Sequence, residues 1–131
     1  MMENILQFIK EQKIVYLATI DGDQARVRPI NGLSEINGKL VWCTNNQKEM
    51  FQQVVANPKV EICMFGKGKV VRVAGRCVPT KDATIKAKYL DLQPGVAKLY
   101  GGKEGTLEVL VFEDATVMTI SGSKKQIIEL Y

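Results

Sequence analysis

The chain has 131 residues, of which 46% are hydrophobic, and this is enough to build one domain with a real core. Its formal net charge of +4 is compatible with an anionic ligand but is weak evidence for nucleic-acid binding. Histidine is absent, which excludes Ser-His-Asp and Cys-His catalysis, His-ligated zinc and proton transfer by an imidazole.

The cysteines are widely spaced and none forms a C-x-x-C pair, so we expect reduced, mostly buried thiols at Cys43, Cys63 and Cys77 and no metal site. No apolar run is long enough to span a bilayer, and the first residues, MMENILQFIKEQK, lack the apolar centre of a signal peptide. These features predict a cytoplasmic protein that does not bind membranes.

The N-terminal half alternates between helical and extended patterns. Its first residues carry apolar side chains at the i, i+3, i+4 and i+7 spacing of an amphipathic helix, and Asn57-Pro58 ends a second helical segment. The apolar face of that second segment consists of Met50, Phe51, Val54 and Val55. The predicted elements are a helix over 2–12, strands over 14–20, 24–30 and 39–44, and a helix over 46–56.

The C-terminal half continues with extended segments and a helical insertion. The predicted elements are strands over 59–65 and 69–79, a helix over about 81–91, a short helix from Pro94 to near Gly101-Gly102, and strands over 106–112 and 116–120. Gly75 lies inside a long predicted strand and indicates a bulge or a sharp bend. Residues 124–131 are compatible with either a helix or an extended segment.

About seven strands joined mostly by short turns predict an antiparallel sheet around one core. A small barrel accommodates such strands without exposing sheet edges, and the inserted helices would cap its openings. We therefore expect an α+β fold that occupies residues 1–131 as a single domain, with a mostly antiparallel β-barrel of six to seven strands and capping helices.

One stretch, from Arg26 to Met50, concentrates polar groups suited to an anion. Arg26 and Arg28 are two residues apart, so their side chains point to the same face of a strand. Pro29 lacks an N–H and predicts an interruption of the sheet ladder. Asn37-Gly38 is a strong hairpin signal, which predicts that this strand lies beside the strand over 39–44.

The segment from Thr44 to Lys48 supplies hydroxyl, amide and ammonium groups at a predicted helix N-terminus. Two arginines, a helix start and a lysine would together bind an anion, most naturally a phosphate. A basic hairpin in solvent followed by an ordinary helix cap would contain the same residues, and spacing alone favours this second interpretation.

The order of these elements, together with several local motifs, resembles the pyridoxamine 5′-phosphate oxidase-like flavin-binding split-barrel family. The similar pieces are YLATIDGDQARVRPI, the hairpin to LVWCTNNQKEMF, the helix exit NPKVEICMF and the long strand VVRVAGRC. The resemblance covers nearly the whole chain, although no single piece is a strict signature. Within the family, the chain looks most like the short members known as nitroimidazole-resistance-related or general stress proteins.

This resemblance implies a split barrel that binds FMN as a homodimer, with two sites at the subunit interface. One family strand runs along the flavin ring and sends a basic side chain to the phosphate, which a later loop also contacts. The matching residues, which would bind the cofactor, are Arg26, Val27, Arg28, Pro29, Ile30, Thr44, Asn45 and Lys48. The implied chemistry is that of an FMN-dependent oxidoreductase with an unknown small-molecule substrate and no identified catalytic residue.

Departures from the family limit what this resemblance implies. The oxidase itself has a lysine where this chain has Asn31, and its phosphate-binding lysine would fall at Met50, so Lys48 would have to act from one turn earlier. The basic C-terminal segment that holds pyridoxal phosphate in the oxidase has no counterpart before Tyr131. We therefore do not expect oxidation of pyridoxamine phosphate.

Other functions stay open at this point. The sequence does not distinguish FMN from a deazaflavin or haem as the cofactor, and a flavin sensor or store would bind the cofactor without catalysis. A small barrel could also bind nucleic acid through its basic strands, but only 7% of residues are aromatic and none interleaves with Arg26, Arg28 or Lys48 as a stacking platform.

Several conspicuous side chains have simpler structural interpretations. Trp42 is expected in the core or at a dimer contact, and Tyr89 and Tyr100 are expected to anchor the helical insertion. Arg72 and Arg76 lie on one face of a long strand and are expected to be solvated or interfacial.

Overall fold

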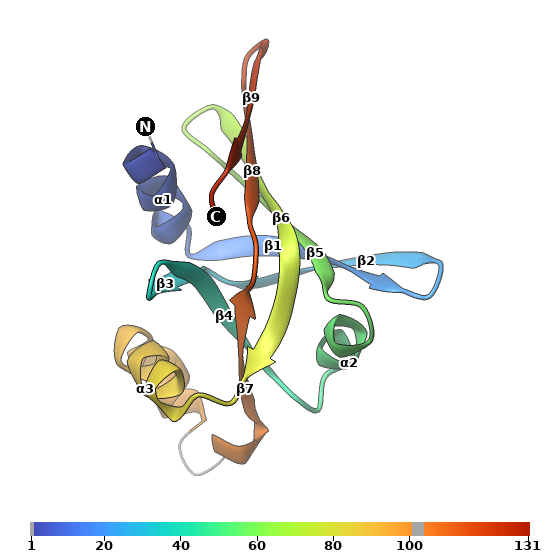
Figure 1. Ribbon diagram of the computed structural model, residues 1–131, viewed down its shortest axis with the longest axis vertical. Helices are drawn as coiled ribbons and strands as arrows, with labels where there is room; N and C mark the ends of the chain where they lie inside the picture. The colour runs from blue at the N-terminus through green and yellow to red at the C-terminus, as the bar shows by residue number, and fades with distance from the viewer. Residues whose placement is uncertain (1, 101–103) are drawn as a thin grey trace.

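Nine strands and four α-helices make up the described part of the chain, residues 2–100 and 104–131 of a computed structural model (Figure 1). The helices are α1 (Met2–Glu11), α2 (Glu49–Ala56), α3 (Ala83–Leu92) and α4 (Pro94–Leu99), with one 3₁₀ turn, η1 (Glu104–Thr106). The strands are β1 (Ile14–Asp21), β2 (Gln24–Asn31), β3 (Ser34–Ile36), β4 (Lys39–Asn45), β5 (Lys59–Gly66), β6 (Lys69–Thr80), β7 (Leu107–Phe112), β8 (Thr116–Ser121) and β9 (Lys124–Glu129). The predicted helix end at Gly101-Gly102 lies outside the described residues.

All pairings between these strands are antiparallel, in the order β2-β1-β5-β6-β7-β4-β3, with β8 on β6 and β9 on β8. The ends of this path, β2 and β3, do not pair with each other, so the sheet curls without closing. The expected α+β split barrel with capping helices is therefore confirmed. The strand count exceeds the prediction because β3 has only three residues and β9 lies in the segment left open between helix and strand.

The long strand β6 changes partner along its length. Its first part, Lys69 to Ala74, pairs with β8, and its last part, Cys77 to Thr80, pairs with β7. Gly75 lies at the change, where an added Cβ would overlap the backbone carbonyl oxygen of Asp114. The predicted bend at Gly75 therefore corresponds to the place where β6 turns from one half of the barrel into the other.

The Asn37-Gly38 turn does not connect the strands that the sequence analysis assigned to it. It joins β3 to β4, with positive φ at both turn residues (54° and 80°), whereas β2 pairs with β1. The prediction that this hairpin places the Arg26 strand beside the Thr44 strand is therefore wrong. The chain leaves β2 at Gly32, whose N–H donates to the carbonyl of Lys13, and Leu33 turns into the core before β3 begins.

The predicted interruption at Pro29 is also wrong. The β1–β2 register runs without a break from Asp21 opposite Gln24 to Ile14 opposite Asn31. Because β2 is an edge strand, a proline there needs no N–H partner on its free side.

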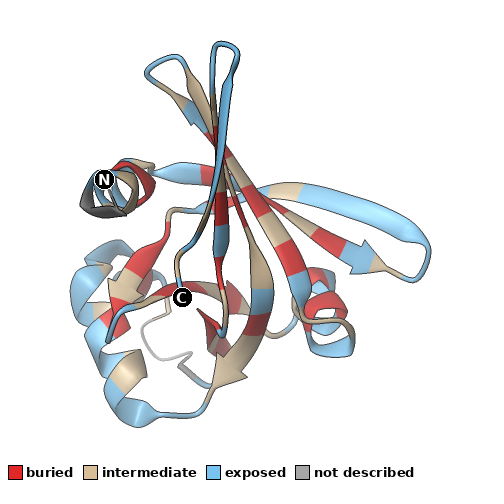
Figure 2. Ribbon diagram, turned by 45° about the horizontal axis from the view of Figure 1, so that its top comes forward, coloured by how far each residue is buried: buried red, intermediate tan, exposed pale blue. Residues whose placement is uncertain are grey.

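The core consists of two clusters of buried side chains. The larger one lies between the sheet and helices α1 and α2, and the smaller one is covered by α3 and α4 around the fully buried Tyr89. Trp42 is fully buried, as one interpretation expected, and its Nε1 donates to the Sγ of Cys77 at 3.3 Å. All three cysteines are free, but only Cys77 is fully buried. Figure 2 shows the buried residues along the inner face of the barrel and the exposed tips of its hairpins.

Helix α2 buries a polar residue on its inner face. Met50 and Val54 are buried as predicted, but Val55 is 56% exposed, and the polar Gln53 is buried on the same side of the helix as Met50 and Val54. None of the described helices is both long enough and apolar enough to cross a membrane.

The close approach at Gly75 generates a stability prediction. Gly75→Ala is expected to lower the free energy of unfolding by about 1–3 kcal/mol, because the new methyl group would have to displace the Asp114 backbone. Gly95→Ala is the matched control, since a Cβ there meets no atom within 4 Å and alanine suits a helix better than glycine. Urea unfolding measures both, and equal stability of the two variants would contradict the steric argument.

Candidate functional site

A cavity of about 600 Å³ lies between β2, the end of β4, the start of α2 and helix α4. We call it the arginine cavity. The predicted site residues that line it are Arg26, Arg28, Pro29, Ile30, Thr44 and Lys48. The two segments therefore meet across the cavity, although the hairpin pairing that was expected to join them does not exist.

Two of the predicted cofactor contacts lie elsewhere. Val27 is 70% exposed on the opposite face of β2, and Asn45 is absent from the cavity lining. The Asn45 side chain instead accepts a hydrogen bond from the backbone N–H of Gln47 at 2.7 Å, which shapes the turn before α2. Contacts of these two residues with a cofactor stay a prediction.

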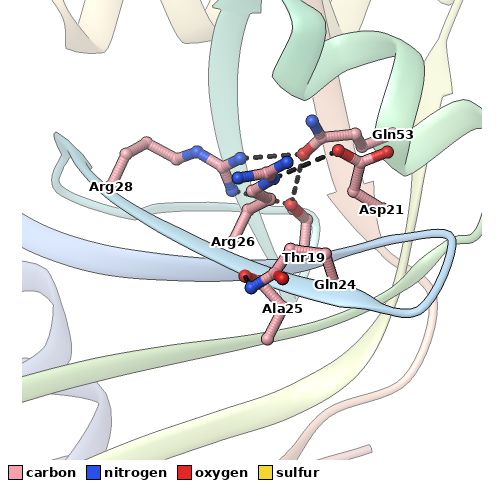
Figure 3. A network of polar contacts seen from close by, with 7 residues as sticks. All are labelled: Thr19, Asp21, Gln24, Ala25, Arg26, Arg28 and Gln53. Atoms are coloured by element: carbon pink, nitrogen blue, oxygen red, sulfur yellow. Dashed lines mark hydrogen bonds and ion pairs between the residues drawn. The ribbon is translucent and has the colours of Figure 1, made fainter.

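Arg28 is held at the cavity by three oxygen atoms that carry no formal charge, and Figure 3 shows two of the residues that supply them, Thr19 and Gln53. Its guanidinium donates to Oγ1 of Thr19 and Oε1 of Gln53, both at 2.8 Å, and to the carbonyl of Leu17 at 3.3 Å. The Thr19 hydroxyl in turn donates to the same Gln53 oxygen at 2.6 Å. This network fixes the Arg28 side chain between β1 and α2.

Arg26 reaches the same region but is paired with a carboxylate. Its Nε lies 3.1 Å from Oδ2 of Asp21, and both side chains are about half exposed, so this pair is screened by solvent. Partial burial, followed by repulsion from the neighbouring Arg26, lowers the pKa of Arg28, although a guanidinium remains protonated at physiological pH. Among residues 2–100 and 104–131, no carboxylate forms an ion pair with Arg28, so its positive charge is available in the cavity.

Thr44 supplies an unpartnered hydroxyl. The residue is 3% exposed, and its Oγ1 has no hydrogen-bond partner within the described part of the chain. A buried hydroxyl without a hydrogen-bond partner costs about 1–3 kcal/mol of stability. The presence of one in the wall of a polar cavity therefore points to a ligand that bonds with it. The alternative that Thr44 caps a helix is wrong, because Thr44 lies within β4 and α2 begins after Lys48.

Lys48 is exposed and immediately precedes α2. Its side chain makes no capping hydrogen bond, and none of the ion pairs among the described residues involves it. Met50, where the family lysine would fall, is buried and lines the same cavity. Glu49 also lines the cavity, so the basic side chains there outnumber the acidic one.

The remaining walls of the cavity were not predicted from the sequence. Helix α4 contributes Val96 and Leu99, and Tyr100 follows it, whereas β4 contributes Cys43 and α2 contributes Gln53. No local pattern connects α4 to the cavity, because its placement depends on tertiary packing. Gln53 did carry a signal, since it is a polar residue spaced as part of the buried face of α2.

None of the titratable hydroxyl or thiol groups in the cavity wall is suited to act as a base near neutral pH. Burial raises the pKa of the Cys43 thiol, an effect that the nearby Lys48 charge only partly opposes. Burial likewise raises the pKa of the Tyr100 hydroxyl. The cavity can therefore bind and orient an anionic ligand, but redox chemistry there would have to come from a bound cofactor.

The unpartnered hydroxyl of Thr44 generates a prediction that needs no ligand. Thr44→Val is expected to raise the free energy of unfolding of the ligand-free protein by about 1 kcal/mol, because it removes a buried unsatisfied group. Thr19→Val is the matched control, and it should lower stability by about 1–3 kcal/mol because that hydroxyl makes two hydrogen bonds. Thermal or urea unfolding decides it, and a Thr44→Val protein as destabilised as Thr19→Val would contradict the assignment.

Comparisons with known proteins agree with this fold. Among solved structures, a NimC/NimA family protein from Clostridium acetobutylicum is 36% identical, with a TM-score of 0.88, and the match covers 98% of this chain and 92% of that one. A haem-binding protein from Mycobacterium smegmatis is 15% identical, with a TM-score of 0.79 and coverage of 98% and 57%. An FAD-binding protein from Mesorhizobium loti is 16% identical, with a TM-score of 0.67 and coverage of 91% and 94%.

The last two likenesses show a shared fold and no more, because identity is low. No curated protein matches the chain. Residues 1–121 match the family model described as "Pyridoxamine 5'-phosphate oxidase", which confirms the resemblance in the sequence. With nearly the whole chain matched, and with the split barrel and its NimC/NimA-like neighbour, the protein belongs to the pyridoxamine 5′-phosphate oxidase family.

Proposed function

We propose that this protein binds FMN in the arginine cavity as a homodimer and acts as a flavin-dependent oxidoreductase on a small-molecule substrate. The observation that carries the proposal is the unpartnered, buried hydroxyl of Thr44 in the same cavity as Arg28 and Lys48. A hydroxyl, a guanidinium with free N–H groups and an ammonium are the donors that a phosphate monoester accepts from. Family membership supports a flavin as the bearer of that phosphate.

Each of these residues has a distinct role in the proposed complex. Thr44, Arg28 and Lys48 would hold the phosphate. The apolar side chains of Val96 and Leu99 on α4, which also line the cavity, would limit the access of water to the bound cofactor. Bound FMN would supply the redox chemistry, since flavins exchange one or two electrons. Because burial raises the pKa values of Cys43 and Tyr100, these two groups would not be the source of protons for the reaction.

The outer face of the sheet supports a dimer. In the continuous strand path β2-β1-β5-β6 with β8 and β9, the register turns a set of exposed apolar side chains to one face. These side chains are Ile14, Tyr16, Ile20, Val27, Phe65 and Ile127. The same face carries the Arg72–Glu61 ion pair among these apolar side chains. Several exposed apolar side chains on one sheet face are typical of a protein–protein interface, and a symmetric pair would bury them on both subunits.

The same face reaches the arginine cavity. Ile14 and Pro29 share a face of the paired strands β1 and β2, and both line the cavity. A second copy packed on the outer face would therefore lie beside the cavity and cover part of its opening. This supports a cofactor site near the subunit interface.

A second function, cofactor binding without catalysis, is favoured by one observation. Burial raises the pKa of the Cys43 thiol and of the Tyr100 hydroxyl in the cavity wall, so neither group readily gives a proton to a substrate near neutral pH. The relative from Mycobacterium smegmatis, moreover, is a haem-binding protein, which makes haem the alternative cofactor. The absorption spectrum of the purified protein distinguishes a flavin from a haem, and turnover of a nicotinamide reductant distinguishes an enzyme from a store.

The phosphate site predicts a preference for FMN over riboflavin. Lys48→Ala should weaken FMN binding by about ten- to a hundredfold, because a charge-assisted contact is lost, and should leave riboflavin binding nearly unchanged. Lys81→Ala is the control, since Lys81 is exposed and does not line the cavity. Titration by flavin fluorescence quenching measures all six affinities, and equal affinity of the unmutated protein for FMN and riboflavin would refute the phosphate site.

The apolar outer face predicts the oligomeric state. The protein should sediment as a dimer, and Tyr16→Arg should shift it to a monomer, because each subunit would bury a new positive charge in the interface. The register places Arg72 of β6 on the same face, two strands away from Tyr16. Leu92→Arg, at an equally exposed apolar position on α3, should leave the dimer intact. A monomer at all concentrations, with and without FMN, would exclude the proposed assembly.

A further inference from the structure

The partners of Arg28 differ from those of the other arginines. Arg26 faces Asp21, Arg72 faces Glu61 and Arg76 faces Asp114, each with a carboxylate oxygen within 3.3 Å. Arg28 instead has the amide oxygen of Gln53, a hydroxyl and a backbone carbonyl. Its charge is therefore oriented by its neighbours but not cancelled by them.

The orientation of the Gln53 amide follows from its partners. Its Oε1 accepts from the Arg28 guanidinium at 2.8 Å and from the Thr19 hydroxyl at 2.6 Å, as Figure 3 shows. The reversed amide would direct its NH₂ donors at a group that can only donate, so the oxygen must face Arg28. Gln53 is buried on α2, whose packing against β1 and β6 keeps this oxygen in place.

The bonding of Arg28 leaves part of the guanidinium available. Three of its hydrogen bonds are accounted for, and because a guanidinium has five N–H donors, two remain without a partner in the described residues. Arg28 and Gln53 both line the arginine cavity. An anion in the cavity can therefore accept from Arg28 while Gln53 and Thr19 hold the rest of the side chain.

We propose that Gln53 is the residue that makes the arginine cavity selective for a ligand with a phosphate group. Its neutral amide positions Arg28 and leaves the arginine charge to the ligand, whereas a glutamate at the same position would form an internal ion pair. The identity of the ligand as FMN rests on the proposed function. The dependence of anion binding on Gln53 does not. Gln53 is a positioning residue, since it acts through Arg28.

The experiment uses the full-length protein and three variants. Gln53→Glu keeps the shape of the side chain and adds a charge, and Gln53→Met keeps its approximate size without an acceptor. Asp21→Asn changes the charge in the opposite direction, because it removes the carboxylate that faces Arg26 at the exposed end of the β1–β2 hairpin. Each protein is titrated with FMN and with riboflavin, and its melting temperature is measured in inorganic phosphate and in sodium chloride of equal ionic strength.

Gln53→Glu should lower FMN affinity by about ten- to a hundredfold, leave riboflavin affinity unchanged and abolish the stabilisation by phosphate relative to chloride. Gln53→Met should lower FMN affinity less, because Arg28 loses its orientation but keeps its charge. Asp21→Asn should raise FMN affinity by up to about fivefold, since the removed pair is exposed to solvent. This opposite change separates an effect of charge from a loss of folding.

The outcomes also separate this inference from the proposed function. If phosphate stabilises the unmutated protein but not Gln53→Glu, and no flavin binds, then the selectivity assigned to Gln53 holds and the flavin function fails. If FMN is preferred but Gln53→Glu weakens FMN and riboflavin equally, Gln53 has only a structural role and the inference is overturned. An FMN preference that survives in Gln53→Glu overturns it as well.

Discussion

The partner exchange of β6 is the constraint on which the rest of the structure depends. This strand of twelve residues pairs with β5 over Lys69 to Arg76, with β8 over Lys69 to Ala74, and with β7 over Cys77 to Thr80. The exchange requires a backbone approach that only Gly75 allows, because any side chain there would overlap Asp114. It divides the sheet into one half formed by β1, β2, β5, β8 and β9 and another formed by β7, β4 and β3.

The arginine cavity is a consequence of this division. The strands β2 and β4 belong to different halves of the sheet. Because the sheet does not close, they do not pair with each other. Helix α2 bridges the two halves, because it follows β4 in the chain and its Gln53 accepts a hydrogen bond from Thr19 on β1. Basic side chains from one half therefore meet the orphaned hydroxyl of Thr44 from the other. A closed barrel would have filled this space with paired backbone.

Most of the fold could be predicted from the sequence because its long strands alternate regularly and its turns carry glycine, asparagine or proline. The strands that were missed have no such signal: β3 has three residues, and β9, with the sequence KKQIIE, is exposed along nearly its whole length. The common face of Arg26 and Arg28 followed from a period of two, and both line the cavity. The proximity of these arginines to Thr44 was predicted for a wrong reason, because the Asn37-Gly38 turn connects β3 to β4 and not β2 to β4. The positions of α4 and of the Gln53 oxygen depend on long-range packing, which local patterns do not encode.

The central claim is that the cavity holds a phosphate through Thr44, Arg28 and Lys48, and a crystal structure of the protein with FMN tests it most directly. The account predicts phosphate oxygens within hydrogen-bond distance of Thr44 Oγ1 and of an N–H group of Arg28, with the Arg28–Gln53 hydrogen bond preserved. A phosphate bound elsewhere on the molecule, with Thr44 still unpartnered, would contradict it.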